Sequence, residues 1–161
     1  MAALETPAPQ PCSLCAHPEA THDDAACSFG WTPPIGPVVL CCGSRDWTDR
    51  ATVLAWLRRF PRGTVVIHGA ARGADTIAAS VARELGFAVR AYPARWDTEG
   101  KAAGPLRNQR MLDSEPDISR CLAFTASIMR DGRLSGTGDM LRRCVEAGVV
   151  ATVVPPGRGP R

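Results

Sequence analysis

The stretch VVIHGAARGAD, residues 65–75, decides the fold of this 161-residue chain. Its β-branched apolar run ends at His68, and a turn with two glycines leads into an alanine-rich segment. A short apolar run bounded by glycine is typical of a buried strand, and the apolar spacing that follows indicates an amphipathic helix. The stretch therefore predicts a strand over 64–68, a tight turn, and a helix over 74–85.

The same alternation of strand and helix runs through most of the chain. Apolar runs predict strands over residues 38–42, 64–68, 87–92, 120–125 and 149–154. Helical spacing predicts helices over residues 49–60, 74–85, 105–113 and 138–147, with a polar loop over 93–104. Alternation favours right-handed crossovers and a parallel sheet, and strands that are apolar on both faces need helices on both sides. We therefore expect an α/β fold, a Rossmann-like three-layer sandwich with a mostly parallel sheet.

Composition is that of a globular protein with one main domain. Hydrophobic residues make up 45% of the chain, and the net charge of +3 shows no cluster that would argue for nucleic acid. The first residues lack the basic start and apolar core of a signal peptide, and no apolar run reaches the ~20 residues that cross a bilayer. We expect a cytoplasmic protein without a membrane partner.

The ends of the chain differ in composition from its middle. We predict a disordered tail over residues 1–11, rich in alanine and proline, and a short Cys/His-rich segment over 12–31. Residues 32–37 are read as a linker to the Rossmann-like domain over 38–154. Residues 155–161 are expected to form a second disordered tail.

The Cys/His-rich segment holds the potential metal ligands Cys12, Cys15, His17, His22 and Cys27. A Cys-x₂-Cys pair aims two thiolates at one ion and is a usual first half of a zinc site. We favour structural zinc held by Cys12, Cys15, His22 and Cys27, because His17 is so close to Cys15 that its ring would face away. The alternative is a tail that carries cysteines without metal.

Four of the strand-to-helix loops combine glycine with a hydroxyl or a basic residue. They are GSRDWTD (43–49), GAARGAD (69–75), WDTEGKAAGPLRNQRM (96–111) and SGTGD (135–139). Glycine lets the backbone approach a ligand, free amides at a helix start favour an anion, and arginine is a forked donor for phosphate. In open α/β sheets, ligands lie beyond the carboxyl ends of the strands. The loops therefore predict a phosphate cradle, although any single Gly/Asp turn is equally consistent with a structural role.

Three residues of these loops carry more specific expectations. Asp75 either caps its helix or accepts a hydrogen bond from a sugar hydroxyl. A bulky residue at Gly73 is expected to lower ligand affinity more than stability, because it would block the approach of the backbone. Trp96 and Trp47 can stack on a base or pack over the edge of the core, and we favour packing for Trp47.

The four loops, in this order, closely resemble the SLOG superfamily, which unites DprA/SMF proteins with the LOG phosphoribohydrolases, and look most like its YspA/YpsA-related branch. The resemblance covers residues 37–154 and implies a Rossmann-like fold that binds a nucleotide or a nucleotide-derived ligand. It also implies that copies of the domain pair through helices. Carried over motif by motif, it places these residues at the ligand: Gly43, Ser44, Arg45, Gly69, Arg72, Gly73, Asp75, Arg107, Asn108, Ser135, Gly136 and Thr137.

The last loop departs from the LOG pattern at one position. LOG enzymes carry a catalytic glutamate three residues after the threonine, where this chain has Met140, and the neighbouring carboxylate is Asp139. Hydrolysis through an oxocarbenium-like sugar needs a carboxylate in a set place. The sequence therefore favours a nucleotide-binding, sensor-like domain. The alternative is a LOG-like N-glycosidase with Arg107 as a catalytic residue. DprA-like DNA binding is a weaker alternative, because a basic run with interleaved aromatic residues is missing.

Overall fold

Five parallel strands form the central sheet, in the order β3-β2-β1-β4-β7. They are β1 (Val38–Gly43), β2 (Val65–His68), β3 (Ala88–Ala91), β4 (Ile118–Phe124) and β7 (Ala151–Val154). The structure, a computed structural model, describes residues 36–160. The predicted N-terminal tail, the Cys/His-rich segment and most of the linker lie outside these residues.

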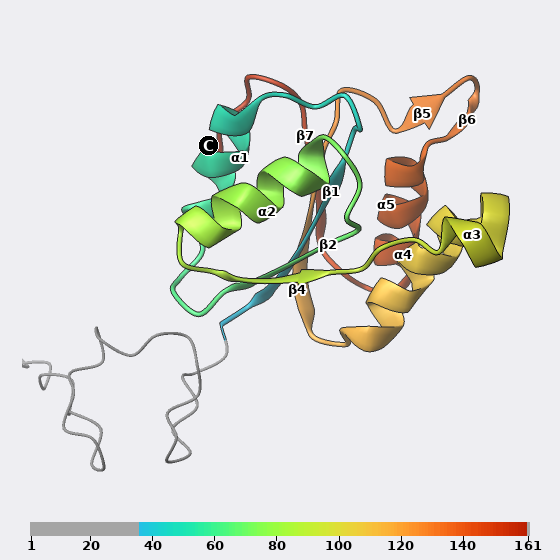
Figure 1. Cartoon of the computed structure of the whole chain (residues 1–161). Helices are drawn as coiled ribbons and strands as arrows, with labels where there is room; N and C mark the ends of the chain where they lie inside the picture. The colour runs from blue at the N-terminus through green and yellow to red at the C-terminus, as the bar shows by residue number, and fades with distance from the viewer. Residues whose placement is uncertain (1–35, 161) are drawn as a thin grey trace, which may run out of the picture. The chain divides into compact units, whose positions relative to one another are not determined.

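Helices cover both faces of this sheet (Figure 1). α1 (Arg50–Leu57) and α2 (Ala74–Glu84) lie on one face, and α4 (Ala103–Ser114) and α5 (Gly136–Glu146) lie on the other. The predicted α/β, Rossmann-like three-layer sandwich is thus confirmed. Within residues 36–160, no helix is both long and apolar enough to cross a membrane.

The central strand β1 contributes to both core layers, because its side chains alternate between the two faces. Val39 and Cys41 pack with the residues of α1 and α2. Leu40 and Cys42 pack with Met111 and the other buried residues of α4 and α5. A strand that is buried on both faces needs an uninterrupted apolar sequence, which is why VVLCC was recognisable as a central strand.

Three features of the fold differ from the sequence prediction. Residues 93–104 are largely helical rather than a polar loop, since they hold α3 (Trp96–Glu99), a 3₁₀ turn (Gly100–Ala102) and the start of α4. The loop before α5 contains a hairpin of β5 (Met129–Arg130) and β6 (Arg133–Leu134). Strand β3 is largely exposed, because it is an edge strand and not one covered on both faces.

The start of α1 is also where the C-terminal residues lie. Asp49 caps the helix, accepting a hydrogen bond from the Thr52 amide at 2.9 Å. Its other carboxylate oxygen accepts from the Gly157 amide at 2.8 Å. The indole of Trp56 is only partly buried and donates to the carbonyl of Arg158 at 2.9 Å. Residues 157 and 158, expected in a loose tail, thus make contacts with this helix.

Candidate functional site

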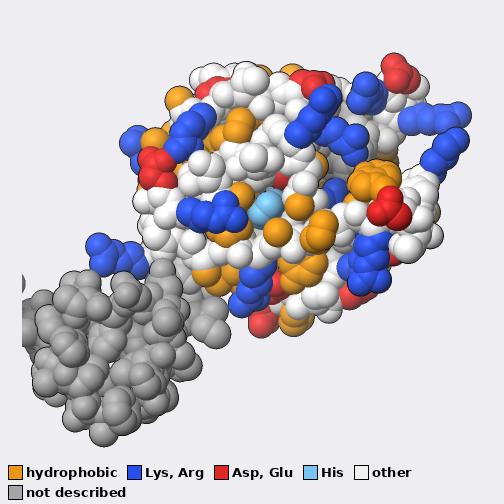
Figure 2. Space-filling view, in the orientation of Figure 1, with side chains coloured by type: hydrophobic (Ala, Val, Ile, Leu, Met, Phe, Trp, Pro, Cys, Tyr) orange, Lys and Arg blue, Asp and Glu red, His pale blue; other side chains and the backbone are white. Residues whose placement is uncertain are grey.

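The carboxyl ends of β1, β2 and β4 and the starts of α2, α4 and α5 surround a cavity of about 820 Å³. Most of the predicted ligand residues line it, namely Gly43, Ser44, Arg45, Gly69, Asp75, Arg107, Asn108, Ser135, Gly136 and Thr137. These residues come from four loops that are far apart in the sequence. On the face shown in Figure 2, basic side chains are spread among apolar and acidic ones, and some lie at the β5–β6 hairpin. The sheet topology therefore brings the four loops to one site.

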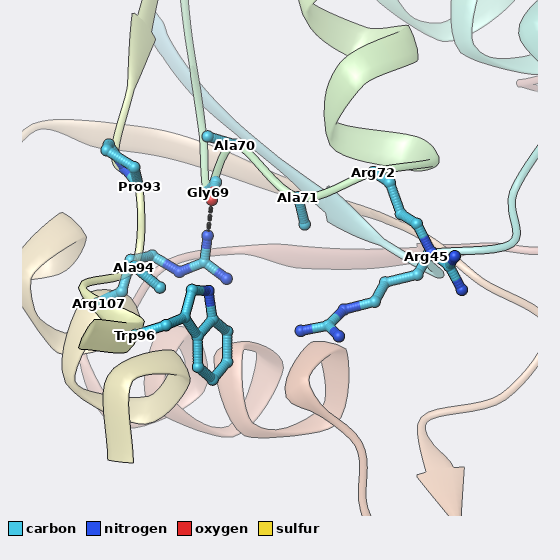
Figure 3. A pocket seen from close by; sticks show the side chains of 9 residues that line it. All are labelled: Arg45, Gly69, Ala70, Ala71, Arg72, Pro93, Ala94, Trp96 and Arg107. Carbon is cyan, nitrogen blue, oxygen red and sulfur yellow. Dashed lines mark hydrogen bonds between the residues drawn. The ribbon is translucent and has the colours of Figure 1, made fainter. Parts of the chain in front are cut away.

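A second hollow of about 410 Å³ adjoins this cavity (Figure 3). Both are lined by Arg45, Gly69, Trp96 and Arg107, whereas Arg72 lines the smaller hollow. The guanidinium of Arg72 lies 3.1 Å from an Asp46 carboxylate oxygen, and both side chains are about three-quarters exposed. Since exposed ion pairs contribute little, this contact leaves Arg72 available to an anion.

Gly73 has a different role from the one predicted, because it lies against the loop after β1 and not at either cavity. Its φ of 77° suits glycine, and a Cβ there would lie 2.4 Å from the Ser44 carbonyl oxygen. The next amide, of Ala74, donates to the same oxygen at 3.0 Å. A larger residue at Gly73 would therefore separate two loops of the site, so a loss of stability is expected beside any loss of ligand affinity.

Arg107, on α4, joins the ends of two strands. Its Nη1 donates to the Gly69 carbonyl and, at 3.4 Å, to the Tyr92 carbonyl, while its Nε donates to the Asn108 side chain at 3.0 Å. A Cβ at Gly69 would overlap this guanidinium, so a larger residue there would displace the end of the Arg107 side chain. Burial lowers the pKa of Arg107, and the charge of Asp75 opposes this shift. The guanidinium thus fixes the loop after β2 and lines both cavities.

Asp75, in the first turn of α2, is the most deeply buried carboxylate of the cavity, with 3% of its surface exposed. One carboxylate oxygen accepts a hydrogen bond from the Ala71 amide at 3.3 Å. Burial raises the pKa of Asp75 to about 6, although the hydrogen bond and the charges of Arg107 and Arg45 act against the rise. Asp75 can therefore exchange a proton near neutral pH.

Asp139 is held in place by donors on two helices. It accepts hydrogen bonds from the Asn108 amide at 3.0 Å and from Arg143 at 2.9 Å, and Arg142 lies 3.0 Å from its other oxygen. Burial alone would raise the pKa of Asp139, but these hydrogen bonds outweigh it and the pKa is lowered. Asp139 therefore links α4 to α5 as a fixed carboxylate, and the side chain of Met140 is buried beside it.

The start of α5 offers free backbone donors to the cavity. Ser135 caps the helix, with its hydroxyl accepting from the Gly138 amide at 3.1 Å. Gly136 and Thr137 follow in the first turn and line the cavity. Sequence reasoning missed the packing role of Gly138, where a Cβ would lie 2.4 Å from the Ile128 carbonyl oxygen. This glycine lets the hairpin lie close to the helix.

His68 shapes the turn after β2. It is buried, and its Nδ1 accepts a hydrogen bond from the Ala70 amide at 3.1 Å. Burial, followed by the charges of Arg83 and Arg107, lowers the pKa of His68, so the ring stays neutral and Nδ1 remains an acceptor. The bond holds Ala70 at the positive φ of 54°, a conformation that residues other than glycine rarely adopt.

The predicted zinc ligands Cys12, Cys15, His22 and Cys27 lie outside the described residues. Among residues 36–160, no cluster of three or more histidine, cysteine or acidic side chains could hold a metal ion. The described cysteines Cys41, Cys42, Cys121 and Cys144 are free and buried, as expected of small core residues.

The fold and the site together define the chain as a SLOG domain, and the comparisons give the family. Residues 37–98 match the model of YAcAr, the YspA, cpYpsA-related SLOG family. The Gene 61 protein of Mycobacterium phage D29 is 43% identical over 122 residues, which are 69% of this chain and 90% of that relative. The chain belongs to the YspA, cpYpsA-related SLOG family.

A solved structure supports the fold. The chain resembles DNA processing protein A (DprA) from Streptococcus pneumoniae with a TM-score of 0.57 and 19% sequence identity. The match covers 76% of this chain and 51% of that one, so this chain spans about half the length of the DprA structure. At this identity the likeness concerns the fold alone.

Proposed function

We propose that the protein binds a nucleotide or a nucleotide-derived ligand in the cavity at the carboxyl edge of the sheet. The observation that carries the proposal is the convergence of Arg45, Arg107 and the start of α5 beside the buried carboxyl of Asp75. The first three provide positive charge or free amides for phosphate. A carboxyl that is buried beside them accepts hydrogen bonds from sugar hydroxyls.

Each loop has a distinct part in this proposal. The ligand's phosphate lies at the first amides of α5, next to Gly136 and Thr137, because a helix start is an anion site. Arg45 supplies the positive charge that neutralises the phosphate, and Asp75 accepts hydrogen bonds from the sugar hydroxyls. Arg107, which the resemblance offers as a catalytic residue, is engaged with the Gly69 carbonyl and is assigned to positioning the loop after β2.

One observation favours a second candidate function, N-glycosidic hydrolysis of a nucleotide. In that reaction water replaces the base at the anomeric carbon, and a carboxylate activates the water. Asp139 cannot take this part, because its oxygens are occupied by donors from α4 and α5. Asp75 lines the cavity with a pKa of about 6, so the hydrolase candidate depends on it.

Titration calorimetry with AMP, GMP, CMP and UMP tests the binding proposal. Arg45→Ala should weaken nucleotide binding by about tenfold or more, because a hydrogen bond to a charged group is lost. Arg62→Ala is a matched control, since that exposed arginine precedes β2 at the opposite edge of the sheet. Failure of every nucleotide to bind the wild-type chain would contradict the proposal.

Chromatography of the same mixtures separates binding from hydrolysis. Binding without turnover leaves each nucleotide intact after long incubation. Release of free base by the wild-type protein, lost in Asp75→Asn, would replace the binding proposal by the hydrolase candidate.

We also propose that residues 12–31 hold one structural zinc ion through Cys12, Cys15, His22 and Cys27. The support is the Cys-x₂-Cys spacing with a histidine and a third cysteine nearby. Such a segment has few apolar residues, so metal binding would supply much of its folding free energy.

A further inference from the structure

The indole of Trp96 is an exposed aromatic surface at the mouth of both cavities. Trp96 begins the short helix α3, and 50% of its surface is exposed. It lines the larger cavity and the adjoining 410 Å³ hollow. A large aromatic side chain left half in water at a basic cavity is a candidate contact for a ligand.

The rest of the hollow is small and apolar around this indole. Its walls include Ala70, Ala71, Pro93 and Ala94, with arginines at its edges. Small side chains leave open space in front of the ring, and Figure 3 shows the indole facing the middle of the hollow. The apolar side chains of this hollow suit a flat, largely apolar group and not a second phosphate.

The guanidinium group of Arg45 lies over the indole of Trp96. The guanidinium carbon of Arg45 lies 5.8 Å from the centre of the Trp96 ring, and the guanidinium groups of Arg45 and Arg107 approach the indole from different sides (Figure 3). A planar cation at this distance makes a cation–π contact, which shows that the ring can accept a flat partner. Since Arg45 also lines the proposed phosphate site, it can leave the ring when an anion is bound.

The β5–β6 hairpin adds apolar surface to the mouth of the larger cavity. Met129 and Leu134 line the cavity, yet they remain 47% and 46% exposed. They lie beside the start of α5, so they frame the larger cavity next to the proposed anion site. A ligand with an anionic end at α5 and a flat apolar end at Trp96 fits this arrangement.

We propose that Trp96 is the platform on which the nucleobase of the ligand stacks, with the base in the 410 Å³ hollow. This proposal rests on the proposed function, because it places the phosphate and the sugar in the larger cavity. Any base can stack on an indole. Trp96 would therefore favour ligands that carry a base, without distinguishing one base from another by hydrogen bonds. Purines, which cover more of the indole, should bind more tightly than pyrimidines.

The test compares a ligand that has a base with one that lacks it. Calorimetry is carried out with AMP and with ribose 5-phosphate on the full chain and on Trp96→Leu. Loss of base stacking should weaken AMP binding by about fivefold or more, while ribose 5-phosphate binding stays unchanged. Trp96→Phe should recover most of the AMP affinity, because it restores a flat ring.

A matched variant and a second readout keep the result specific to stacking. Trp56→Leu alters a partly buried indole on α1, whose residues do not line either cavity, and should leave AMP binding unchanged. AMP should also quench tryptophan fluorescence in the wild type and in Trp56→Leu, and the quenching should be lost in Trp96→Leu.

The outcomes separate this inference from the function on which it rests. Unchanged AMP affinity in Trp96→Leu, with binding still weakened by Arg45→Ala, would overturn the stacking platform and leave nucleotide binding standing. An equal loss of AMP and ribose 5-phosphate binding would show that Trp96 only supports the fold of the site. A wild-type chain that binds no nucleotide would remove both proposals together.

Discussion

The carbonyl oxygen of Ser44 lies where the side chain of residue 73 would begin, 2.4 Å from a Cβ built on Gly73. The loop after β1 and the loop after β2 therefore make a direct backbone contact here, besides the ion pair of Arg72 with Asp46. Glycine is required at this contact for two reasons, the positive φ of 77° and the lack of space. The geometry of the larger cavity depends on this contact, since Ser44, which makes it, and Asp75, which follows Gly73 by two residues, both line the cavity.

Gly73→Ala is therefore expected to destabilise the fold. The backbone conformation alone should lower the free energy of unfolding by about 1–3 kcal/mol, and the clash with Ser44 adds to this loss. Urea unfolding followed by circular dichroism measures it. Gly104→Ala, within α4, is the control, because a Cβ there makes only an ordinary contact with Trp96 at 3.7 Å. Equal stability of Gly73→Ala and the wild type would show that the two loops can separate freely.

Asp75→Asn should stabilise the protein at neutral pH. The pKa of Asp75 in the folded protein, about 6, lies above the ordinary value of 3.8, so the folded state binds this proton more tightly than the unfolded state. The contribution of Asp75 to stability therefore falls as pH rises from about 4 to about 6 and then levels off. At pH 7.5 the variant should gain of the order of 1–3 kcal/mol, since each pKa unit corresponds to about 1.4 kcal/mol.

Urea unfolding at several pH values between 4 and 8 checks this expectation. The stability of Asp75→Asn relative to the wild type should increase between pH 4 and pH 6, whereas that of Asp117→Asn, which alters an exposed aspartate before β4, should not change in this way. A variant whose stability follows the wild-type curve at every pH would mean that Asp75 is as well solvated in the fold as in the unfolded chain.

Asn108→Ala should loosen the contact between α4 and α5. Its amide donates to the Gly136 carbonyl at 3.2 Å and to Asp139 at 3.0 Å, and only 4% of the residue is exposed. Loss of these bonds should lower the free energy of unfolding by about 1–3 kcal/mol, because buried acceptors lose their donor. Hydrogen exchange in the first turn of α5 should rise as well. Asp113→Ala, at an exposed position of α4 whose hydrogen-bond partner Gln109 lies in the same helix, provides the comparison.

The full-length protein should contain about one zinc ion per chain, with four ligands as in other structural zinc sites. Elemental analysis of protein purified without added metal measures the content, and a chelator should release the ion. Cys15→Ser should abolish binding, whereas His17→Ala should not, since His17 is outside the favoured ligand set. Absence of zinc from the purified wild type would end this proposal.

The sequence predicted the sheet and the convergence of the loops because both depend on local signals. Buried apolar runs and the glycines that end them identify β1 and β2 without knowledge of their neighbours. The exposure of β3 was not predictable in this way, since its sequence is apolar enough and only its place at the edge leaves it uncovered. The β5–β6 hairpin was missed because two-residue strands are too short to show alternation.

The chemistry of the site was predictable only in part. The resemblance to SLOG proteins pointed to Arg45, Asp75 and Arg107, and the structure brings them to one cavity. The raised pKa of Asp75 comes from burial by elements distant in the sequence, which no local pattern records. In the same way, the hydrogen bond that Arg107 donates to the Gly69 carbonyl depends on where α4 lies relative to the end of β2, and a local pattern does not record this.

The bond from the Ala74 amide to Ser44 also limits how this site can diversify. Insertions or deletions in the loop after β1 would displace the start of α2. The contact with α2 therefore constrains the length of that loop. Helix α3 and the β5–β6 hairpin are not tied to this bond, and they can change in length and side chains at less risk to the sheet. Selectivity for new ligands should therefore evolve through those two elements, while the backbone around the proposed anion site changes little.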